Sequence, residues 1–537
     1  MKISVFKNNI NVIIDIINKK INKILRASQI SIYLIVGLCF VTGLFLHIEW
    51  NDLSILQARS LDEYAFVEPL INISDGIKVF SLEKIFSFIF YSYGFLYFFL
   101  NFLSTFLYLD EIMNPAFISS IRVLAVSIFC ANLLIFYKII DQSIISLLER
   151  VVLMFILVTM PAIWTFSGYI HPDFLMMCSF LASVMSMIKA DKQINKFYWF
   201  SLALYGFAIS IKFQALIFFP FYIWVWLAYL SDKSSKKVFF FRSIVKSLFL
   251  ILFIFIATNP YVLSSQGFDA WMASINADFL SNKTNHGNDE RILLMDKLNF
   301  SLFEFYYDKF VLAVLLFSSI FMVLKESYKK SFSVYGGIAI FCILYFCYLM
   351  FFVNKSWALY FLPFGIASII VLINLPEMVQ FKFFKIKRFR LILLSTILLS
   401  NVLSNFALNK EIFLNHFNGN SISYDAINKN EIVFVNPQNE LIKSRELADI
   451  LRNFSNQSKI ITTPYVNFPF KQLNKTYMDV RTIYDFDKIL NISDLSGEDL
   501  IFIINKRYES EIKKILGKTN ASLLGTTNDY LLFDLQT

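Results

Sequence analysis

The sequence predicts an all-α polytopic membrane bundle of about 11–13 transmembrane helices, followed by a small C-terminal α/β domain. Three observations support this fold class. Hydrophobic residues make up 57% of the 537 residues, and the mean hydropathy is +0.59. Charged residues make up only 17%, whereas soluble proteins carry roughly 25%. The tail from residue 410 onward differs from the rest because its composition is that of an ordinary soluble domain.

The N-terminal segment 1–27 is polar and basic, with isoleucines at helical spacing from Ile10 to Ile24. This pattern predicts a helix that lies on the membrane surface, not a cleavable signal peptide. Basic residues are enriched in cytoplasmic segments. The cluster here therefore places the N-terminus in the cytoplasm; it consists of Lys19, Lys20, Lys23 and Arg26.

Residues 28–408 form the predicted membrane module. A stretch of about 18–25 apolar residues is long enough to cross a bilayer. Within 196–230 the division into two segments is the hardest to fix, because the stretch also fits one long span. The candidate segments lie near 29–48, 84–108, 117–140, 147–169, 172–189, 196–211, 213–230, 243–259, 309–324, 334–353, 356–375 and 389–408.

Positive charge predicts the sidedness of the module. Four basic clusters are expected in the cytoplasm, and the loops 49–81 and 260–308, His171 and the C-terminal domain are then expected outside. Three apolar segments lie between residues 81 and 171, and three crossings would move His171 to the cytoplasmic side. One of these segments must therefore fail to cross. The segment that ends near Pro161 is the candidate, since an interior proline breaks a helix. The clusters are Lys189, Lys192, Lys196; Lys233, Lys236, Lys237, Arg242, Lys246; Lys325, Lys329, Lys330; and Lys382, Lys385, Lys387, Arg388, Arg390.

The tail, 410–537, is predicted to be an extracytoplasmic α/β domain. Runs rich in β-branched and aromatic residues indicate strands, and helical periodicity indicates helices at 440–454 and 508–516. No phosphate-binding loop or nucleophile elbow occurs in it, so it receives no catalytic residue. The expected strands are Ile432–Val435, Lys459–Thr462, Leu500–Ile504 and Tyr530–Phe533.

Composition also excludes several classes of site. All five cysteines lie inside apolar stretches and the four histidines are scattered, which argues against a disulfide framework and a zinc centre. The formal charge of +9 is concentrated beside apolar segments. It therefore sets membrane topology and does not predict a nucleic-acid partner.

Two outer segments contain acidic residues near the start of a helix. The first reads Arg59-Ser60-Leu61-Asp62-Glu63-Tyr64, and the second reads His171-Pro172-Asp173. A carboxylate at the membrane face can act as a general base or bind a metal. Taken alone, each group also fits an ordinary helix start, where an acidic residue stabilises the positive end of the helix dipole.

Cationic and aromatic residues follow in later outer segments. Lys212 lies between two apolar runs, where it either snorkels to the interface or binds a phosphate. His286 is most simply a loop histidine, and Trp357 and Tyr360 are most simply interfacial aromatics. Lys355 belongs to the same segment as these aromatics, Asn354 to Pro363.

The order of these motifs resembles the GT-C superfamily of polyprenyl-phosphate-sugar-dependent glycosyltransferases. It is most similar to the branch of protein O-mannosyltransferases and lipid A aminoarabinose transferases, and the resemblance covers roughly residues 28–375. It implies that Asp62 is the catalytic base, with Glu63 as its neighbour in the loop motif, and that Asp173 orients the acceptor or the sugar. If a divalent cation such as Mg²⁺ or Mn²⁺ assists, Asp62 and Asp173 would be its ligands.

The resemblance also implies a substrate-binding set. Lys212 would bind the donor phosphate, and Tyr93 belongs to the aromatic turn Tyr91-Ser92-Tyr93-Gly94 of such enzymes. Relatives often carry an arginine directly before the tyrosine of the Tyr-x-Leu-Pro segment; here Leu359 takes that place and Lys355 is the candidate substitute. The full set is Arg59, Tyr93, His171, Lys212, His286, Lys355 and Tyr360.

The implied function is a membrane glycosyltransferase at the outer side of a bacterial inner membrane. It would move a sugar from a polyprenyl-phosphate donor to a hydroxyl of an envelope lipid, glycan or protein, by a single inverting displacement. Its partners would be the bilayer, the donor and the acceptor. Two alternatives remain open: a flippase or transporter of a lipid-linked saccharide, and a ligase that joins whole glycan chains. Substitution of Asp62 by Asn discriminates the transferase from the flippase, which should tolerate it.

Overall fold

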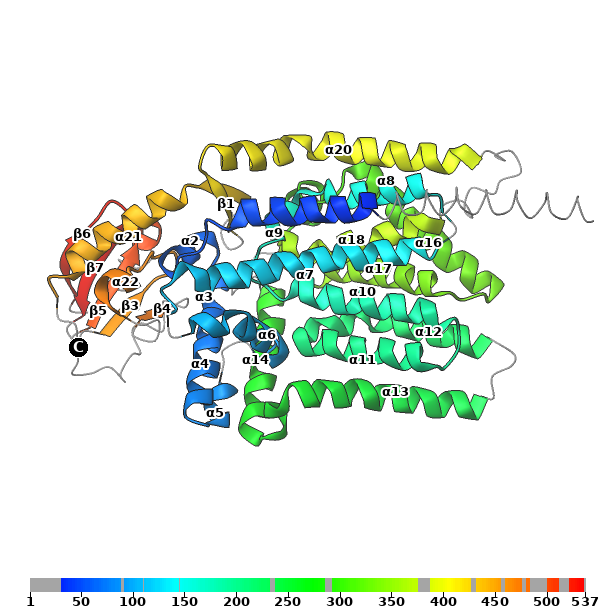
Figure 1. Ribbon diagram of the computed structural model, residues 1–537, viewed down its shortest axis with the longest axis horizontal. Helices are drawn as coiled ribbons and strands as arrows, with labels where there is room; N and C mark the ends of the chain where they lie inside the picture. The colour runs from blue at the N-terminus through cyan, green and yellow to red at the C-terminus, as the bar shows by residue number, and fades with distance from the viewer. Residues whose placement is uncertain are drawn as a thin grey trace, which may run out of the picture.

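Long helices run side by side through a bundle, and a small α/β domain lies at one end of it (Figure 1). The N-terminal segment 1–27 lies outside the described residues. The computed structural model describes residues 30–87, 91–109, 111–143, 145–231, 237–284, 292–374, 387–425, 431–454, 459–475, 480–482, 500–510 and 521–535.

The bundle confirms the predicted polytopic membrane architecture. Within the described ranges, eight helices are long and apolar enough to cross a membrane. They are Ile30–His47, α7 (Pro115–Asp141), α10 (Asp173–Ala190), the segment Phe213–Leu230 formed by η3 (Phe213–Phe218) and α12 (Phe219–Ser231), α13 (Lys237–Thr258), α16 (Lys309–Lys329), α17 (Val334–Phe351) and α20 (Lys387–Phe417). Shorter apolar stretches are Phe95–Tyr108 (α6, Phe95–Thr105, and η2, Phe106–Tyr108), α11 (Lys196–Ile211) and Ala358–Asn374 (η6, Ala358–Phe361; α18, Leu362–Val371; η7, Leu372–Asn374).

The stretch 147–169 is broken at Pro161, as the sequence predicts. Helix α8 (Leu147–Val158) ends and α9 (Pro161–Phe166) begins there. A break of this kind leaves backbone carbonyls without helical partners, and in a membrane each must find another donor. Side-chain amides of α20 supply them: Asn409 donates to the Thr159 carbonyl at 2.8 Å, and Asn401 donates to the Ile156 carbonyl at 3.3 Å.

A second short segment is α6, which lies within the stretch predicted as 84–108. Gly94, just before α6, donates its backbone N–H to Ile211 at the end of α11. The helix that follows, α7, begins on the same side, because its second turn carries Arg122, which bonds to Glu63 of the first outer loop. Both ends of α6 therefore lie at one end of the bundle, and its 11 residues span only about 16 Å.

Short helices cross the end of the bundle that faces the α/β domain (Figure 1). The first outer loop, predicted as 49–81, folds into η1 (Leu53–Ile55), α2 (Leu56–Arg59), α3 (Leu61–Ala65), α4 (Val67–Lys78) and α5 (Leu82–Ile85). The third, predicted as 260–308, folds into η4 (Pro260–Leu263), α14 (Ser265–Thr284), α15 (Leu294–Lys297) and η5 (Leu298–Phe303).

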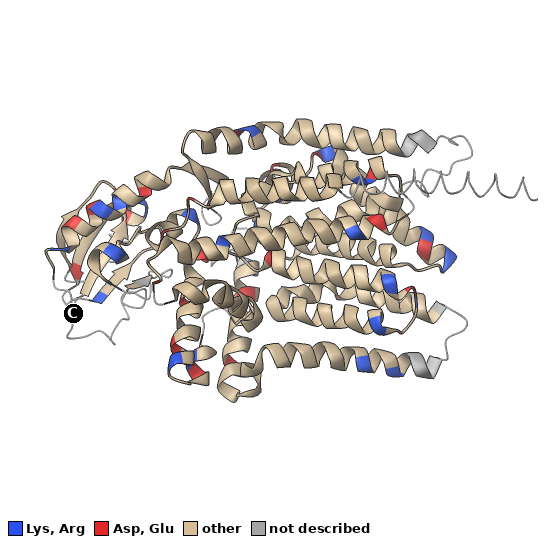
Figure 2. Ribbon diagram, viewed as in Figure 1, with Lys and Arg blue, Asp and Glu red and all other residues tan. Residues whose placement is uncertain are grey.

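Lysines and arginines gather at the opposite end of the bundle (Figure 2). Lys189 lies in the last turn of α10, Lys196 begins α11, and Lys329 ends α16, so two of the predicted basic clusters share one end of the bundle. The other two clusters lie partly outside the described residues.

The α/β domain begins after α20, which continues to Phe417. A five-stranded sheet has the order β4-β3-β5-β7-β6, with β3 parallel to β4 and β5, and β7 antiparallel to β5 and β6. The predicted strands are present, together with three that the sequence analysis missed: β1, β4 and β6. The elements are β1 (Ser421–Asp425), β2 (Glu431–Val435), α21 (Pro437–Leu451), β3 (Lys459–Thr462), α22 (Phe470–Leu473), β4 (Val480–Thr482), β5 (Leu500–Asn505), η11 (Lys506–Tyr508), β6 (Ala521–Thr526) and β7 (Tyr530–Leu535). Most of the predicted helix 508–516 lies outside the described residues.

The hairpin β1–β2 attaches this domain to the outer loops. Ser423 of β1 donates its hydroxyl to the carbonyl of Ala58 in α2 at 2.6 Å. The hydroxyl of Tyr424 accepts the backbone N–H of Ala358 at 2.9 Å. One strand therefore contacts both the acidic loop and the segment that carries Lys355 and Tyr360.

Candidate functional site

A short backbone bridge places the first cationic residue of the site. Lys212 leaves the end of α11 in an extended conformation and pairs antiparallel with Tyr93. Two hydrogen bonds of 3.0 Å flank the bridge, from Gly94 to Ile211 and from Phe213 to Ser92. Only glycine fits at position 94, since a Cβ there would lie 1.5 Å from the Ser210 carbonyl oxygen. The sequence Tyr-Ser-Tyr-Gly is thus the partner strand of Lys212.

Lys212 forms a buried ion pair with Asp173. Its Nζ lies 3.0 Å from one carboxylate oxygen and 3.2 Å from the other, and the lysine is 1% exposed. His171 Nδ1 is a second partner of this carboxylate. The ammonium also lies over the rings of Tyr93, at 5.3 Å, and Tyr360, at 5.8 Å. Residues from three distant segments therefore meet around one carboxylate.

A second buried lysine, Lys355, lacks a carboxylate bonded to it among the described residues. Its Nζ donates to the Ser281 hydroxyl at 2.7 Å and lies 4.3 Å from the centre of the Trp357 ring. Burial lowers the pKa of Lys355 from 10.5 to about 8, although Asp278 and Asp62 nearby favour the charged form. Its charge is therefore less compensated than that of Lys212.

The third outer loop holds this lysine in place. The C-terminal turn of α14 contributes Ser281 and Asn282, and the Asn282 carbonyl accepts the backbone N–H of Asn354 at 2.6 Å. The Tyr360 hydroxyl donates to the Asn282 side chain at 3.3 Å. A helix of the loop 260–308 and the segment after α17 thus form one wall.

A cavity of about 240 Å³ lies against this wall. Its lining is mainly apolar and aromatic, and its few polar groups are near the lysines. Asp278 is one of them, and burial raises the pKa of its carboxyl group. The lining residues are Ser92, Phe213, Gln214, Leu216, Ile217, Ile275, Asp278, Phe279, Asn282, Tyr345, Tyr348, Leu349, Val353 and Tyr360. The space suits an apolar chain with an anionic end.

Asp62 is not among the residues that line the cavity, but its charge acts on groups at the cavity wall. It occupies the first turn of α3 and is half-buried. Within the part of the chain that the structure describes, no hydrogen bond or ion pair engages its carboxylate. Its negative charge favours the charged form of Lys355 and helps to raise the pKa of the Asp278 carboxyl group. A carboxylate that no described residue engages, and whose charge acts on the buried Lys355, is available for proton transfer.

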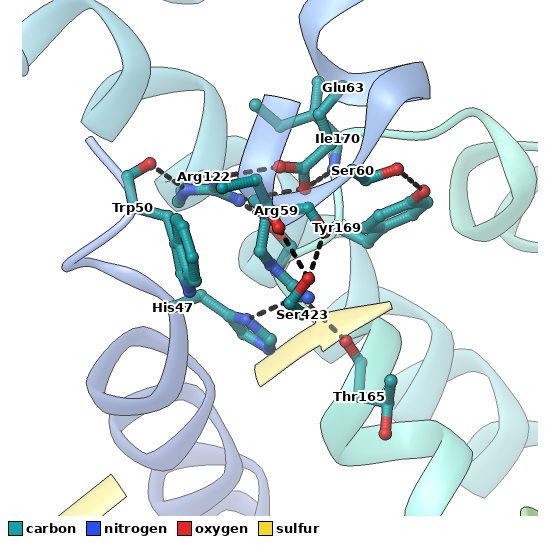
Figure 3. A network of polar contacts seen from close by, with 12 residues as sticks. His47, Trp50, Arg59, Ser60, Glu63, Arg122, Thr165, Tyr169, Ile170 and Ser423 are labelled. Atoms are coloured by element: carbon teal, nitrogen blue, oxygen red, sulfur yellow. Dashed lines mark hydrogen bonds and ion pairs between the residues drawn. The ribbon is translucent and has the colours of Figure 1, made fainter. Parts of the chain in front are cut away.

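The adjacent Glu63 has the opposite environment (Figure 3). It is 0% exposed and forms two parallel hydrogen bonds with Arg122, of 3.0 and 2.9 Å. The backbone N–H of Ile170 donates to it at 2.9 Å. Burial acts to raise the pKa of Glu63, but the guanidinium groups of Arg122 and Arg59 outweigh it and lower that pKa. Glu63 is thus fully occupied by protein groups.

Arg59 belongs to the cluster of polar contacts around Glu63 and does not line the cavity. Its guanidinium lies 3.2 Å from His47 Nδ1, donates to the Thr165 carbonyl at 3.2 Å and lies 5.6 Å from the centre of the Tyr169 ring (Figure 3). Ser423 of the C-terminal domain bonds to the carbonyls beside it. We refer to this set, centred on Glu63, Arg122 and Arg59, as the buried network.

The structure therefore divides the residues predicted for the site. Seven of them are linked to the Lys212 ion pair or to Lys355 by contacts or by charge, and one of the seven, Tyr360, also lines the cavity: Asp62, Tyr93, His171, Asp173, Lys212, Lys355 and Tyr360. Arg59 and Glu63 lie in the buried network. His286 lies outside the described residues.

Sequence reasoning missed Asp278 and Arg122. Asp278 lies one helical turn before Ser281 and Asn282, so polar residues at helical spacing were the available signal. Arg122 lies in an apolar helix, where an ionisable residue marks either a function or a buried partner. Here the partner is Glu63.

The residues do not fit a divalent cation shared by Asp62 and Asp173. Both oxygens of Asp173 are already engaged by Lys212 and His171, and adding a cation beside an ammonium is unfavourable. Among the described residues there is also no group of three or more His, Cys, Asp or Glu side chains with metal-binding geometry.

Taken together, the long apolar helices and the site at one end of the bundle define a multi-pass membrane protein. No family model and no curated protein matches the sequence. Solved structures do match the fold. ArnT from Cupriavidus metallidurans bound to undecaprenyl phosphate matches with a TM-score of 0.51 at 9% identity, over 94% of this chain and 97% of that one. Its apo state gives 0.52 at 8% identity, over 95% and 98%.

A second neighbour is the archaeal oligosaccharyltransferase AglB from Archaeoglobus fulgidus, in complex with an inhibitory peptide and a dolichol-phosphate. It matches with a TM-score of 0.53 at 10% identity, over 90% of this chain and 70% of that one. These likenesses confirm the GT-C resemblance at the level of the fold. At identities this low, the matches show a shared fold and not a shared substrate.

Proposed function

We propose that this protein is a membrane glycosyltransferase that moves a sugar from a polyprenyl-phosphate donor to a hydroxyl of an envelope lipid, glycan or protein. The observation that carries the proposal is the juxtaposition of an apolar cavity, two buried lysines and an open carboxylate. Neighbours of the same fold are bound to undecaprenyl phosphate or dolichol-phosphate, which supports a polyprenyl-phosphate ligand here.

The two lysines receive different roles. Lys355 is the residue that contacts the departing phosphate, because its charge has no bonded carboxylate in the described chain. Lys212, held by Asp173, is a positioning residue that fixes Tyr93 and Tyr360 around the ammonium. This differs from the resemblance, which gives the phosphate to Lys212.

The reaction follows from these positions. Asp62 accepts the proton of the acceptor hydroxyl as its oxygen attacks the anomeric carbon of the donor sugar. The bond from that carbon to the phosphate oxygen breaks, and the electron pair leaves with the phosphate, whose charge Lys355 stabilises. A single displacement of this kind inverts the anomeric centre. The catalytic face would be extracytoplasmic, since the basic ends of the helices lie opposite.

The test compares envelope glycans by mass spectrometry in three strains: a deletion, the deletion complemented with the wild type, and the deletion complemented with Asp62→Asn. We expect one sugar mass to disappear in the deletion and only the wild type to restore it. Full restoration by Asp62→Asn would overturn the proposal and favour a flippase for a lipid-linked saccharide. Loss of a whole glycan chain would instead indicate a chain ligase.

A further inference from the structure

The strand β1 of the C-terminal domain is buried on both of its faces. It belongs to a two-stranded sheet with β2, and its side chains from Ser421 to Tyr424 are at most 7% exposed. Successive side chains of a strand point to opposite faces. Neighbouring residues of β1 therefore contact different parts of the membrane module.

One face of β1 contacts the first outer loop. The Ser423 hydroxyl donates to the Ala58 carbonyl at 2.6 Å and lies 3.4 Å from the Arg59 carbonyl (Figure 3). These two residues end α2, and the last carbonyls of a helix have no helical partner. The next helix, α3, carries Asp62 in its first turn. Ser423 therefore holds the backbone from which the proposed base projects.

The other face of β1 contacts the segment that carries the second buried lysine. The Tyr424 hydroxyl accepts the backbone N–H of Ala358 at 2.9 Å. Ala358 is 0% exposed and begins η6, where the first N–H groups have no helical partner. It lies between Trp357 and Tyr360, whose ring centres are 4.3 and 5.9 Å from Lys355 Nζ. Tyr424 therefore holds the backbone between the two rings that face this ammonium group.

The proposed displacement needs the base and the phosphate-binding cation at a fixed separation. The base acts on the acceptor and the cation acts on the departing phosphate, and a misplacement of about 1 Å can lower the rate by about 100-fold. We infer that β1 sets the separation between Asp62 and Lys355. Ser423 is the positioning residue on the acidic side, and Tyr424 is the positioning residue on the cationic side.

This spacing role gives the C-terminal domain a part in the reaction, although the domain contributes no catalytic residue. It rests on the proposed function, because it requires Asp62 and Lys355 to act on one substrate. A single rigid strand that is bonded to both segments prevents them from moving independently. Loss of either bond should therefore affect one side of the site and leave the other side in place.

The test compares two neighbouring substitutions in the full chain. Tyr424→Phe removes the hydroxyl bonded to Ala358 but keeps the ring, whose centre lies 5.1 Å from that of Phe166. Ser423→Ala removes the hydroxyl bonded to α2. The matched control is Tyr530→Phe, because the buried Tyr530 hydroxyl also accepts a backbone N–H, at 3.2 Å, but within the C-terminal domain. Each protein, reconstituted in nanodiscs, would be assayed for undecaprenyl phosphate binding, sugar transfer, melting and backbone amide exchange.

We expect Tyr424→Phe to weaken undecaprenyl phosphate binding by about tenfold, because a bond to a charged group is worth about that much, and to lower turnover. Amide exchange of the peptide that contains Ala358 should also become faster. Ser423→Ala should lower turnover and leave undecaprenyl phosphate binding unchanged, since it affects only the side of the base. Tyr530→Phe should change none of these properties.

Two results would overturn the inference. Equal weakening of binding by Tyr424→Phe and Ser423→Ala would mean that both changes only loosen the attachment of the domain. Wild-type binding and wild-type exchange in Tyr424→Phe would mean that Tyr424 does not hold the segment. Both readouts are independent of sugar transfer. A wild-type protein that binds undecaprenyl phosphate but transfers no sugar would therefore contradict the proposed function, while a binding difference between the two variants would still support the positioning role of Tyr424.

Discussion

Two adjacent carboxylates, Asp62 and Glu63, lie in opposite environments although one peptide bond joins them. Glu63 is fully buried and bonded on both oxygens by Arg122 and Ile170. Asp62 is half-buried and its carboxylate is not engaged by any described residue. The α3 helix turns successive side chains about 100° apart. Glu63 therefore joins the buried network and is suited to hold the loop. Asp62 points away from that network and is suited to react.

The largest expected effect is at Asp62. Asp62→Asn should lower transferase activity by on the order of 10²–10⁴-fold, because a positioned base contributes about that much. The change is isosteric and removes no bond of the described chain, so thermal unfolding should not shift. Turnover and melting of the purified protein would be measured together. Glu68→Gln, a half-buried acid of α4 in the same loop, is the control, and activity retained by Asp62→Asn would contradict the assignment.

Breaking the buried network tests the other half of the comparison. Arg122→Leu should destabilise the protein by about 3–5 kcal/mol, because it leaves the Glu63 charge buried without its partner. Replacing both residues, as Glu63→Leu with Arg122→Leu, should recover part of this loss. Thermal unfolding in detergent measures both. A Glu63→Gln protein that melts like the wild type but has no activity would show that Glu63 takes part in the chemistry.

The two lysines sharpen the contrast further. Since the pKa of Lys355 is lowered to about 8, its ammonium is lost as the pH rises through that value. We expect kcat/KM for the donor to fall by up to about tenfold per pH unit above pH 8, because this ratio reports the free enzyme. Lys355→Arg should move the decline to higher pH, since arginine stays charged. Lys355→Met should lower kcat/KM for the donor and remove this pH step; an unchanged profile would exclude Lys355 from phosphate binding.

The smallest effect concerns the attachment of the C-terminal domain. The buried Gln57 of α2 donates to Thr482 at 3.1 Å and accepts the backbone N–H of Val466 at 3.2 Å. Gln57→Ala should cost about 1–3 kcal/mol, since it leaves that N–H without a partner, and should lower activity only slightly. Melting curves would detect it, with exposed Gln142→Ala as control. No shift in melting would mean that the hairpin β1–β2 alone holds the two parts together.

Much of the membrane architecture follows from the sequence because apolar length and positive charge are local properties. The break at Pro161 was predictable for the same reason. The role of α6 was not, since whether a marginal segment crosses depends on where its ends are held. Backbone bonds at Gly94 and the position of Arg122 hold both ends of α6 on one side, and no local pattern records them.

The site shows the same division. The sequence alone determined which residue types were available: an acidic pair in the first outer loop, Asp173 before a helix, and lysines at 212 and 355. Only the tertiary structure decided their partners. Lys212 is compensated by Asp173 and Lys355 is not, and Glu63 is bound by an arginine 59 residues away. The physical reason is that the charge a buried group carries depends on what lies within a few ångströms of it, and in this bundle those neighbours come from helices far apart in the chain.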